Sequence, residues 1–323
     1  ELRGEIIEAT AAMEARSPDT GKARELLEQL LRQPGAERWQ ITTWFLLAKL
    51  CDKLGDYAAC MEYLRLAHAS QMKIAAQLVP ELIEPSANPL HITNFHVTAE
   101  QFRQWKPVEA PALAQSPVFV LGFPRSGTTM LEQMLDAHPA LASMDERPFV
   151  QRVIERMQSM GLQYPEHLGE LDSAQCESLR QVYWKAVSEV VQLQPGQRLV
   201  DKNPLTMLRL PLLVRLFPNA KIIFVVRHPC DVVLSNYMQH FNAPAYVALC
   251  SSLPRLAAGY AAAMRFWHAH VALLKPQVLE WNYEDAIADF AGNVARLGAF
   301  LELDDVAPLH DFSEHARRKG YIG

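Results

Sequence analysis

The sequence predicts an α/β fold, in which a parallel sheet carries helices on both faces, preceded by an all-α helical domain. Three observations support this. Helical spacing without a convincing strand fills residues 1–80, and a proline-rich segment follows over 81–116. Over 117–323, short apolar runs alternate with helical patterns, which is typical of parallel strands under covering helices. We therefore divide the chain into a helical domain, a linker and an α/β domain with these bounds.

The composition argues against several classes of protein. Half of the 323 residues are hydrophobic and 21% are charged, which is an ordinary globular balance. The net charge of −5 argues against a nucleic-acid binder, because such proteins present an excess of Lys and Arg to phosphate. No apolar run reaches the roughly 18–20 residues that span a bilayer. We expect the longest runs, Thr43–Leu50 and Lys221–Val226, to be a core helix and a core strand.

The cysteines are scattered, odd in number and never spaced as C-x-x-C. This pattern argues against a disulfide framework and against a structural zinc site. We expect buried free thiols in a reducing cytoplasm, and therefore a cytoplasmic protein. The five cysteines are Cys51, Cys60, Cys176, Cys230 and Cys250.

The helical domain resembles the tetratricopeptide repeat family over Thr42–Ala69. Two helices are expected to meet at the turn Leu54-Gly55-Asp56-Tyr57, where small residues at Ala48, Cys60 and Ala67 allow a close approach. The segment Gly21–Leu31 is similar to the second helix of a preceding repeat. Only one repeat is well formed, whereas about three are needed for independent stability. An ordinary helical hairpin is the alternative.

The linker is expected to be an extended, crossing segment, because prolines interrupt any periodicity. These prolines are Pro80, Pro85, Pro89, Pro107, Pro111 and, just beyond it, Pro117. In the α/β domain, the expected strands are Val118–Gly122, Arg198–Asp201, Lys221–Val226 and Val278–Trp281. The expected helices are Gly127–Ala137, Leu205–Phe217, Asp231–His240, Arg255–Leu274 and Glu284–Leu301. Ligands of such sheets bind beyond the carboxyl ends of the strands.

The first of these strands is followed by Gly122-Phe123-Pro124-Arg125-Ser126-Gly127-Thr128-Thr129. This is the G-x-x-x-x-G frame of a P-loop, which directs backbone N–H groups and a helix N-terminus at an anion. The lysine that usually follows the second glycine is replaced by Thr128, and Arg125 supplies the positive charge from within the loop. A glycine-rich turn without a ligand is the alternative.

The sequence also contains no apolar run that ends in an aspartate suited to magnesium, because Lys221–Val226 ends in Arg227. A nucleotide triphosphate recruits a metal for its transfer chemistry. A sulfuryl group bridged to one phosphate carries less charge, so arginine, lysine and backbone amides could suffice without magnesium.

Arg227 and Ser235 form a second candidate anion site, since Ser235 follows eight residues later on the next expected helix. A guanidinium at a strand end and a hydroxyl from a facing helix could clamp a second phosphate. Alone this pair is weak evidence, because an arginine at a strand end is more often solvated or ion-paired.

With both features present, the chain resembles the sulfotransferases that use 3′-phosphoadenosine 5′-phosphosulfate (PAPS). Their loop for the 5′-phosphosulfate matches Pro124–Thr129, and their pair for the 3′-phosphate matches Arg227 and Ser235. The resemblance extends over Pro117–Leu301. It is strongest to the tyrosylprotein branch and to bacterial relatives that carry tetratricopeptide repeats. It implies PAPS as co-substrate, adenosine 3′,5′-bisphosphate (PAP) as product and no required metal.

The resemblance also implies roles in catalysis. Glu146 matches the base that takes the acceptor proton, with the neighbouring Asp145 as its rival, and an exposed acidic cluster paired with Arg147 is the alternative. Lys202 matches the lysine at the bridging oxygen, with an ordinary exposed lysine as the alternative. Arg125 would be the second cation, while Ser126, Gly127, Thr128 and Thr129 complete the loop. Tyr283 matches a position near the nucleotide or is a core tyrosine.

The acceptor is a hydroxyl on a protein tyrosine, a sugar or a small phenol, and the sequence does not choose between them. The helical domain is expected to recruit a protein acceptor or to mediate a homodimer. Two other readings stay open. One is a tetratricopeptide scaffold with a non-catalytic sulfotransferase-like domain, and the other is a P-loop kinase or NTPase.

Overall fold

The computed structural model describes residues 20–84, 86–144 and 146–312, and the chain divides into two compact units. The first comprises residues up to 91 together with 233–261. The second comprises 92–232 and the residues from 262 onward. No helix among the described residues is long and apolar enough to cross a membrane.

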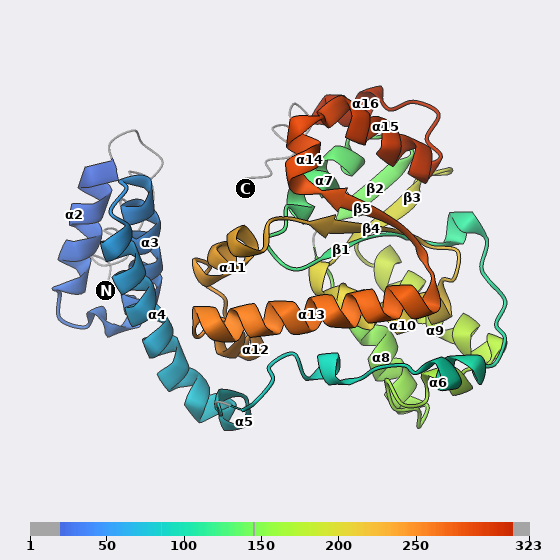
Figure 1. Ribbon diagram of the computed structural model, residues 1–323, viewed down its shortest axis with the longest axis horizontal. Helices are drawn as coiled ribbons and strands as arrows, with labels where there is room; N and C mark the ends of the chain where they lie inside the picture. The colour runs from blue at the N-terminus through green and yellow to red at the C-terminus, as the bar shows by residue number, and fades with distance from the viewer. Residues whose placement is uncertain (1–19, 85, 145, 313–323) are drawn as a thin grey trace. The chain divides into compact units, whose positions relative to one another are not determined.

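The first unit is helical (Figure 1). It contains α2 (Thr20–Leu31), α3 (Gln40–Lys53), α4 (Tyr57–Leu78), α5 (Pro80–Ile83) and α12 (Pro244–Leu249). Helices α3 and α4 pack together across the expected turn, in which Gly55 has φ +75° and the Asp56 side chain accepts a hydrogen bond from the Ala59 N–H. Asp56 also pairs with Arg24 of α2 at 3.0 Å. The helical hairpin is confirmed, whereas the tetratricopeptide assignment stays a prediction.

The second unit is built on five parallel strands in the order β2-β3-β1-β4-β5. They are β1 (Val118–Gly122), β2 (Leu141–Met144), β3 (Arg198–Lys202), β4 (Lys221–Val226) and β5 (Gln277–Asn282). Four of them match the expected strands. β2 was not expected as a strand, because its sequence Leu-Ala-Ser-Met is short and lacks the β-branched and aromatic residues typical of strands.

Helices cover both faces of the sheet, as predicted (Figure 1). One face packs on α7 (Thr128–Asp136), α14 (Tyr283–Ala288), α15 (Phe290–Leu301) and α16 (Ala307–His310), with Val120, Val200 and Ile223 in its core. The other packs on α9 (Ser173–Ser188), α10 (Leu210–Leu216) and the later part of α13 (Leu253–Leu274). There Phe119 contacts Tyr183 of α9 and Phe224 stacks on Trp267 of α13. Side chains alternate between the faces because successive residues of a strand point in opposite directions.

Two of the expected helices are wrong in extent. The span 205–217 is a 3₁₀ segment (Pro204–Arg209) followed by α10, because Pro211 has no N–H to continue a helix from the preceding turn. The span 284–301 breaks at Asp289, whose side chain caps α15 by accepting a hydrogen bond from the Gly292 N–H at 3.0 Å.

Several other helices were not expected from the sequence, or differ in extent from the expected ones. The helix expected over 231–240 is α11 (Pro229–Tyr237). Helices α8 (Phe149–Ser159) and α9 were not expected, and neither was α12. The segment expected to be extended contains α5, α6 (Ala99–Arg103) and two 3₁₀ turns. Of the five free thiols, four are buried as expected, whereas Cys230 is exposed.

Tyr183 and Asp201 form a buried polar pair between α9 and β3. The Tyr183 hydroxyl donates to Asp201 Oδ2 at 2.6 Å, and both side chains are buried. Burial raises the pKa of Asp201 to about 6, although the Tyr183 hydrogen bond opposes that rise by stabilising the ionised form. The hydroxyl therefore stabilises the fold most where Asp201 is ionised.

We expect Tyr183→Phe to lower the free energy of unfolding by about 1–3 kcal/mol at pH 7.5, because it leaves a buried carboxylate without its donor. The loss should shrink at pH 5, below the folded-state pKa of Asp201 of about 6, where the native carboxyl is protonated. Urea unfolding at both pH values measures this, with the exposed Tyr57→Phe as control. A loss that does not depend on pH would contradict the prediction.

Candidate active site

The predicted site residues of the second unit follow different strands but lie on one edge of the sheet. The loop after β1, Lys202 at the end of β3, Arg227 after β4 and Tyr283 after β5 all come at carboxyl ends. Glu146 follows β2 by two residues. Because the five strands are parallel, these ends face the same way. The sheet therefore gathers residues that are far apart in the sequence.

The loop after β1 is held tightly at its base. A Cβ on Gly122 would lie 2.7 Å from the Val225 carbonyl oxygen, so only glycine allows β1 and β4 to approach this closely. The buried Ser126 donates its hydroxyl to the Phe123 carbonyl oxygen at 2.7 Å, which closes the turn. Arg125 has φ +68°, an unusual left-handed conformation for a residue with a side chain.

The far end of the loop opens helix α7. Gly127 is the residue before the first turn and has φ +98°. The first N–H groups of a helix have no partner within it, so such a terminus is suited to an anion. Arg125 and Thr129 are exposed beside them, whereas Thr128, which stands where a P-loop NTPase has lysine, is buried.

Tyr283 connects this loop to Arg227. A Cβ on Gly127 would lie 2.6 Å from Tyr283 Cδ2, so the ring packs directly on the glycine. The Arg227 guanidinium carbon lies 4.9 Å from the centre of the same ring, which is a cation–π contact. Tyr283 is half-buried, and its ring contacts both predicted anion-binding elements; that it lies near a bound nucleotide stays a prediction.

Arg227 is half-buried and has a further contact, with Asp231. Its Nη2 lies 3.4 Å from Asp231 Oδ2, and its buried Nε has no hydrogen-bond partner among the described residues. The next residue, His228, donates its N–H to Glu284 at 2.9 Å. Ser235 lies on α11, on residues that belong to the first unit.

Lys202 is buried and has two carboxylate partners. Its Nζ lies 2.8 Å from Glu146 Oε1 and 3.2 Å from Glu132 Oε2. The side chain is 7% exposed, so the alternative of an exposed lysine is wrong. Burial alone would lower the pKa of Lys202, but the charges of Glu132 and Glu146 outweigh it, and the net shift is upward. The lysine is therefore a fixed cation at the edge of the sheet.

The structure thus joins the predicted base and the predicted lysine in one ion pair. The Glu146 side chain is 53% exposed and pairs with Lys202, not with Arg147 as the acidic-cluster alternative supposed. The rival base, Asp145, lies outside the described residues.

Glu132 and Ser143 were missed from the sequence. Glu132 lies on α7 with its side chain only 3% exposed, and Ser143 of β2 donates its hydroxyl to Glu132 Oε1 at 2.7 Å. A signal was present, because Thr128, Glu132 and Asp136 recur every four residues along the buried side of a helix. A charged residue in such a stripe calls for a buried partner.

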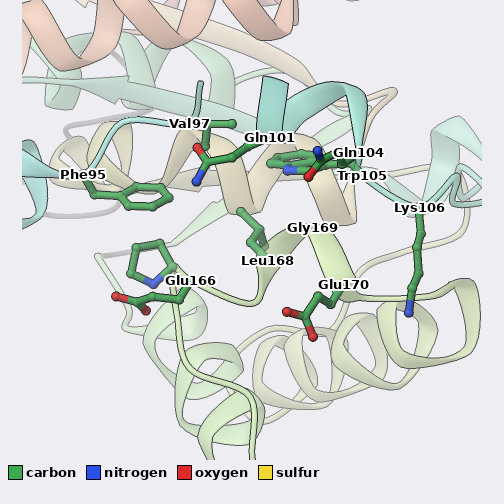
Figure 2. A pocket seen from close by; sticks show the side chains of 11 residues that line it. Phe95, Val97, Gln101, Gln104, Trp105, Lys106, Glu166, Leu168, Gly169 and Glu170 are labelled. Carbon is green, nitrogen blue, oxygen red and sulfur yellow. The ribbon is translucent and has the colours of Figure 1, made fainter. Parts of the chain in front are cut away.

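Two further features bear on function: a surface cavity and the question of a metal site. A surface cavity of about 210 Å³ is lined by residues within 95–106, on and around α6, and within 165–170, before α9 (Figure 2), and none of the site residues named above belongs to it. Its walls include Trp105, whose ring packs on Gly169. Among the described residues, no group of three or more His, Cys, Asp or Glu side chains is arranged to hold a metal.

Comparisons with known proteins found relatives that match different shares of this chain. An uncharacterized protein of Aquifex aeolicus is 29% identical over 300 residues, which is 88% of this chain and 38% of that protein. Protein-tyrosine sulfotransferase 1 of Mus musculus is 35% identical over 114 residues, 34% of this chain and 30% of that enzyme. The chain thus spans well under half the length of these relatives.

Solved sulfotransferases resemble the chain more distantly. The sulfotransferase domain of the curacin biosynthetic pathway has 23% identity and a TM-score of 0.41, covering 60% of this chain and 76% of that domain. A sulfotransferase of Mycobacterium avium has 14% identity and a TM-score of 0.42, covering 99% and 88%.

The family model described as "Sulfotransferase family" matches residues 117–308, which include the loop, Lys202, Arg227 and Tyr283. The chain belongs to the sulfotransferase family.

Proposed function

We propose that this chain transfers a sulfuryl group from PAPS to an acceptor hydroxyl. The contact of Tyr283 with both Gly127 and Arg227 carries this proposal. It puts an anion-binding helix terminus and a second cation on one aromatic ring. Such a site suits one ligand with two anionic groups separated by a nucleoside.

The loop has features that suit the 5′-phosphosulfate. Gly122 and Gly127 let the loop pack closely on β4 and on the Tyr283 ring, and Arg125 and Thr129 of the same segment are exposed. Backbone N–H groups of such a loop suit an anion. Ser126 and Thr128 are buried, so we assign them to holding the loop and offering their N–H groups. Arg227 is assigned to the 3′-phosphate, for which its planar fork of donors is suited. That Ser235 shares this phosphate stays a prediction.

The chemistry is assigned to Lys202 and Glu146. The acceptor oxygen attacks sulfur, the bond from sulfur to the bridging oxygen of the 5′-phosphate breaks, and the acceptor proton passes to Glu146. Lys202 and Arg125 would offset the negative charge that develops on the leaving phosphate, which stabilises the transition state. PAP and the sulfated acceptor are the products.

A kinase or NTPase is not favoured by any observation, since the buried Thr128 occupies the lysine position of the P-loop. The acceptor class is left to experiment. A tyrosyl peptide is the first acceptor to assay, because the named relatives are protein-tyrosine sulfotransferases. Recruitment of a protein acceptor by the helical unit, homodimerisation and a location in the cytoplasm likewise stay predictions.

We expect PAP to bind without magnesium and more tightly than ATP, and Arg227→Ala to weaken that binding by roughly 10- to 150-fold, because hydrogen bonds to charged groups contribute about 1.5–3 kcal/mol. Titration calorimetry measures this. Arg152→Ala is the control, since it removes an exposed arginine paired with Glu189. Lack of PAP binding by the folded wild type would favour a scaffold over an enzyme.

Gly127→Ala should abolish PAP binding, whereas Gly196→Ala should not. Both glycines have positive φ, +98° and +85°, so both substitutions cost about 1–2 kcal/mol of backbone strain. Only at Gly127 would the new Cβ meet the Tyr283 ring, at 2.6 Å, while nothing lies within 4 Å at Gly196. Equal affinities of the two variants for PAP would show that the contact with Tyr283 does not matter.

Glu146→Gln should lower kcat for sulfuryl transfer by about 10²–10⁴-fold, the range for loss of a general base, while PAP affinity changes little. Transfer of ³⁵S from labelled PAPS to tyrosyl, sugar and phenol acceptors measures kcat. A variant that keeps wild-type kcat on the best acceptor would exclude Glu146 as the base and return the role to Asp145.

A further inference from the structure

The two carboxylates that contact Lys202 differ in their surroundings. The Glu132 side chain is 3% exposed and the Glu146 side chain is 53% exposed. Glu132 comes from the second turn of α7, and Glu146 comes from the chain just after β2. One partner is fixed inside the protein, and the other lies at the surface, where a substrate can reach it.

Glu132 is fixed by groups that do not touch Lys202. Ser143 of β2 donates its hydroxyl to Glu132 Oε1 at 2.7 Å, which leaves Oε2 for the lysine. Ser143 also donates its N–H to Asp136 Oδ1 at 3.1 Å, one helical turn further along α7. Hydrogen bonds thus link Asp136 to Ser143 and Ser143 to Glu132, and Glu132 pairs with Lys202. All four side chains are buried.

The proposed reaction separates Lys202 from Glu146. Lys202 must direct its ammonium at the leaving phosphate, and Glu146 must accept the acceptor proton, so their mutual hydrogen bond cannot persist. A buried cation that loses its partner is strongly destabilised. A lysine with Glu146 alone would therefore resist the change that the reaction needs.

We propose that Glu132 is the positioning residue for Lys202, the counter-ion that keeps the ammonium fixed at the carboxyl edge of β3 while Glu146 leaves to act as base. The expected effect of Glu132 on catalysis rests on the proposed function, whereas its ion pair with Lys202 does not. Glu132 acts through Lys202 and does not contact the substrate.

A second buried lysine in the same sheet, with a carboxylate partner whose side chain is 66% exposed, provides the control. Lys221, at the amino end of β4, is also buried, and its Nζ lies 2.6 Å from Glu302 Oε1. This edge is opposite to the site. Glu302→Gln therefore removes a carboxylate from a buried lysine without touching the chemistry.

The effect of Glu132 on the Lys202 amine is measured by the rate at which an amine-reactive reagent labels this lysine, followed by peptide mass spectrometry. Glu132→Gln should raise the labelling rate of Lys202 several-fold and leave Lys221 unchanged, because the lysine loses a buried partner and its pKa falls. Glu302→Gln should do the reverse. Unchanged labelling of Lys202 in Glu132→Gln would overturn the inference. If that variant does not fold, Ser143→Ala replaces it, with the same expected direction.

The catalytic part is measured by a double-mutant cycle in the full chain. Glu132→Gln should lower kcat about tenfold or more with the KM for PAPS nearly unchanged, Glu132→Asp should recover part of kcat, and Glu302→Gln should keep it. In a Lys202→Ala background, Glu132→Gln should have no further effect on kcat. Additive losses would overturn the positioning role and indicate a structural one. If the wild type transfers no sulfuryl group from PAPS, the proposed function fails, and the labelling rates decide whether Glu132 holds Lys202.

Discussion

In a sheet whose strands are all parallel, every strand delivers the residue that follows it to the same edge. The site depends on this constraint. Gly122, Lys202, Val226 and Asn282 end four strands that lie side by side, and the predicted site residues of the loop, β3, β4 and β5 lie at or just after these ends. β1 is central in the strand order, so its loop has a neighbour on each side.

Two adjacent residues of β3 show how the sheet separates charge. Asp201 points to the face covered by α9, where a neutral tyrosine hydroxyl is its partner, and its pKa rises to about 6. Lys202 points to the face covered by α7, where two carboxylates hold it as a cation. Alternation along one strand thus produces a weakly acidic carboxyl and a fixed ammonium within one residue of each other. Both side chains are buried, and burial disfavours the charge on each. The neutral hydroxyl offsets only part of this effect on the pKa of Asp201, whereas two carboxylates outweigh it on the pKa of Lys202.

The sequence predicted the fold class, four of the five strands and the loop after β1, because these depend on local apolar runs and on glycine spacing. It did not predict β2, whose four residues pair with β3 only in the folded sheet. It also placed Lys202 and Glu146 in the site without indicating that they pair. Glu132 could be recognised only as a charged residue in the buried stripe of α7, because its partners Ser143 and Lys202 reach its carboxylate only in the folded sheet. The break at Asp289 comes with local side-chain hydrogen bonds at this residue, which composition does not reveal.

The left-handed backbone at Arg125 has a consequence for how this loop can change over evolution. An arginine with φ +68° costs the fold roughly 1–2 kcal/mol relative to a glycine there. Glycine or asparagine at this position would relieve the backbone strain, and either one would remove a cation from the loop. Where the arginine persists, selection for its charge must outweigh a standing thermodynamic penalty. A chain that no longer needed the charge would be free to lose it and gain stability.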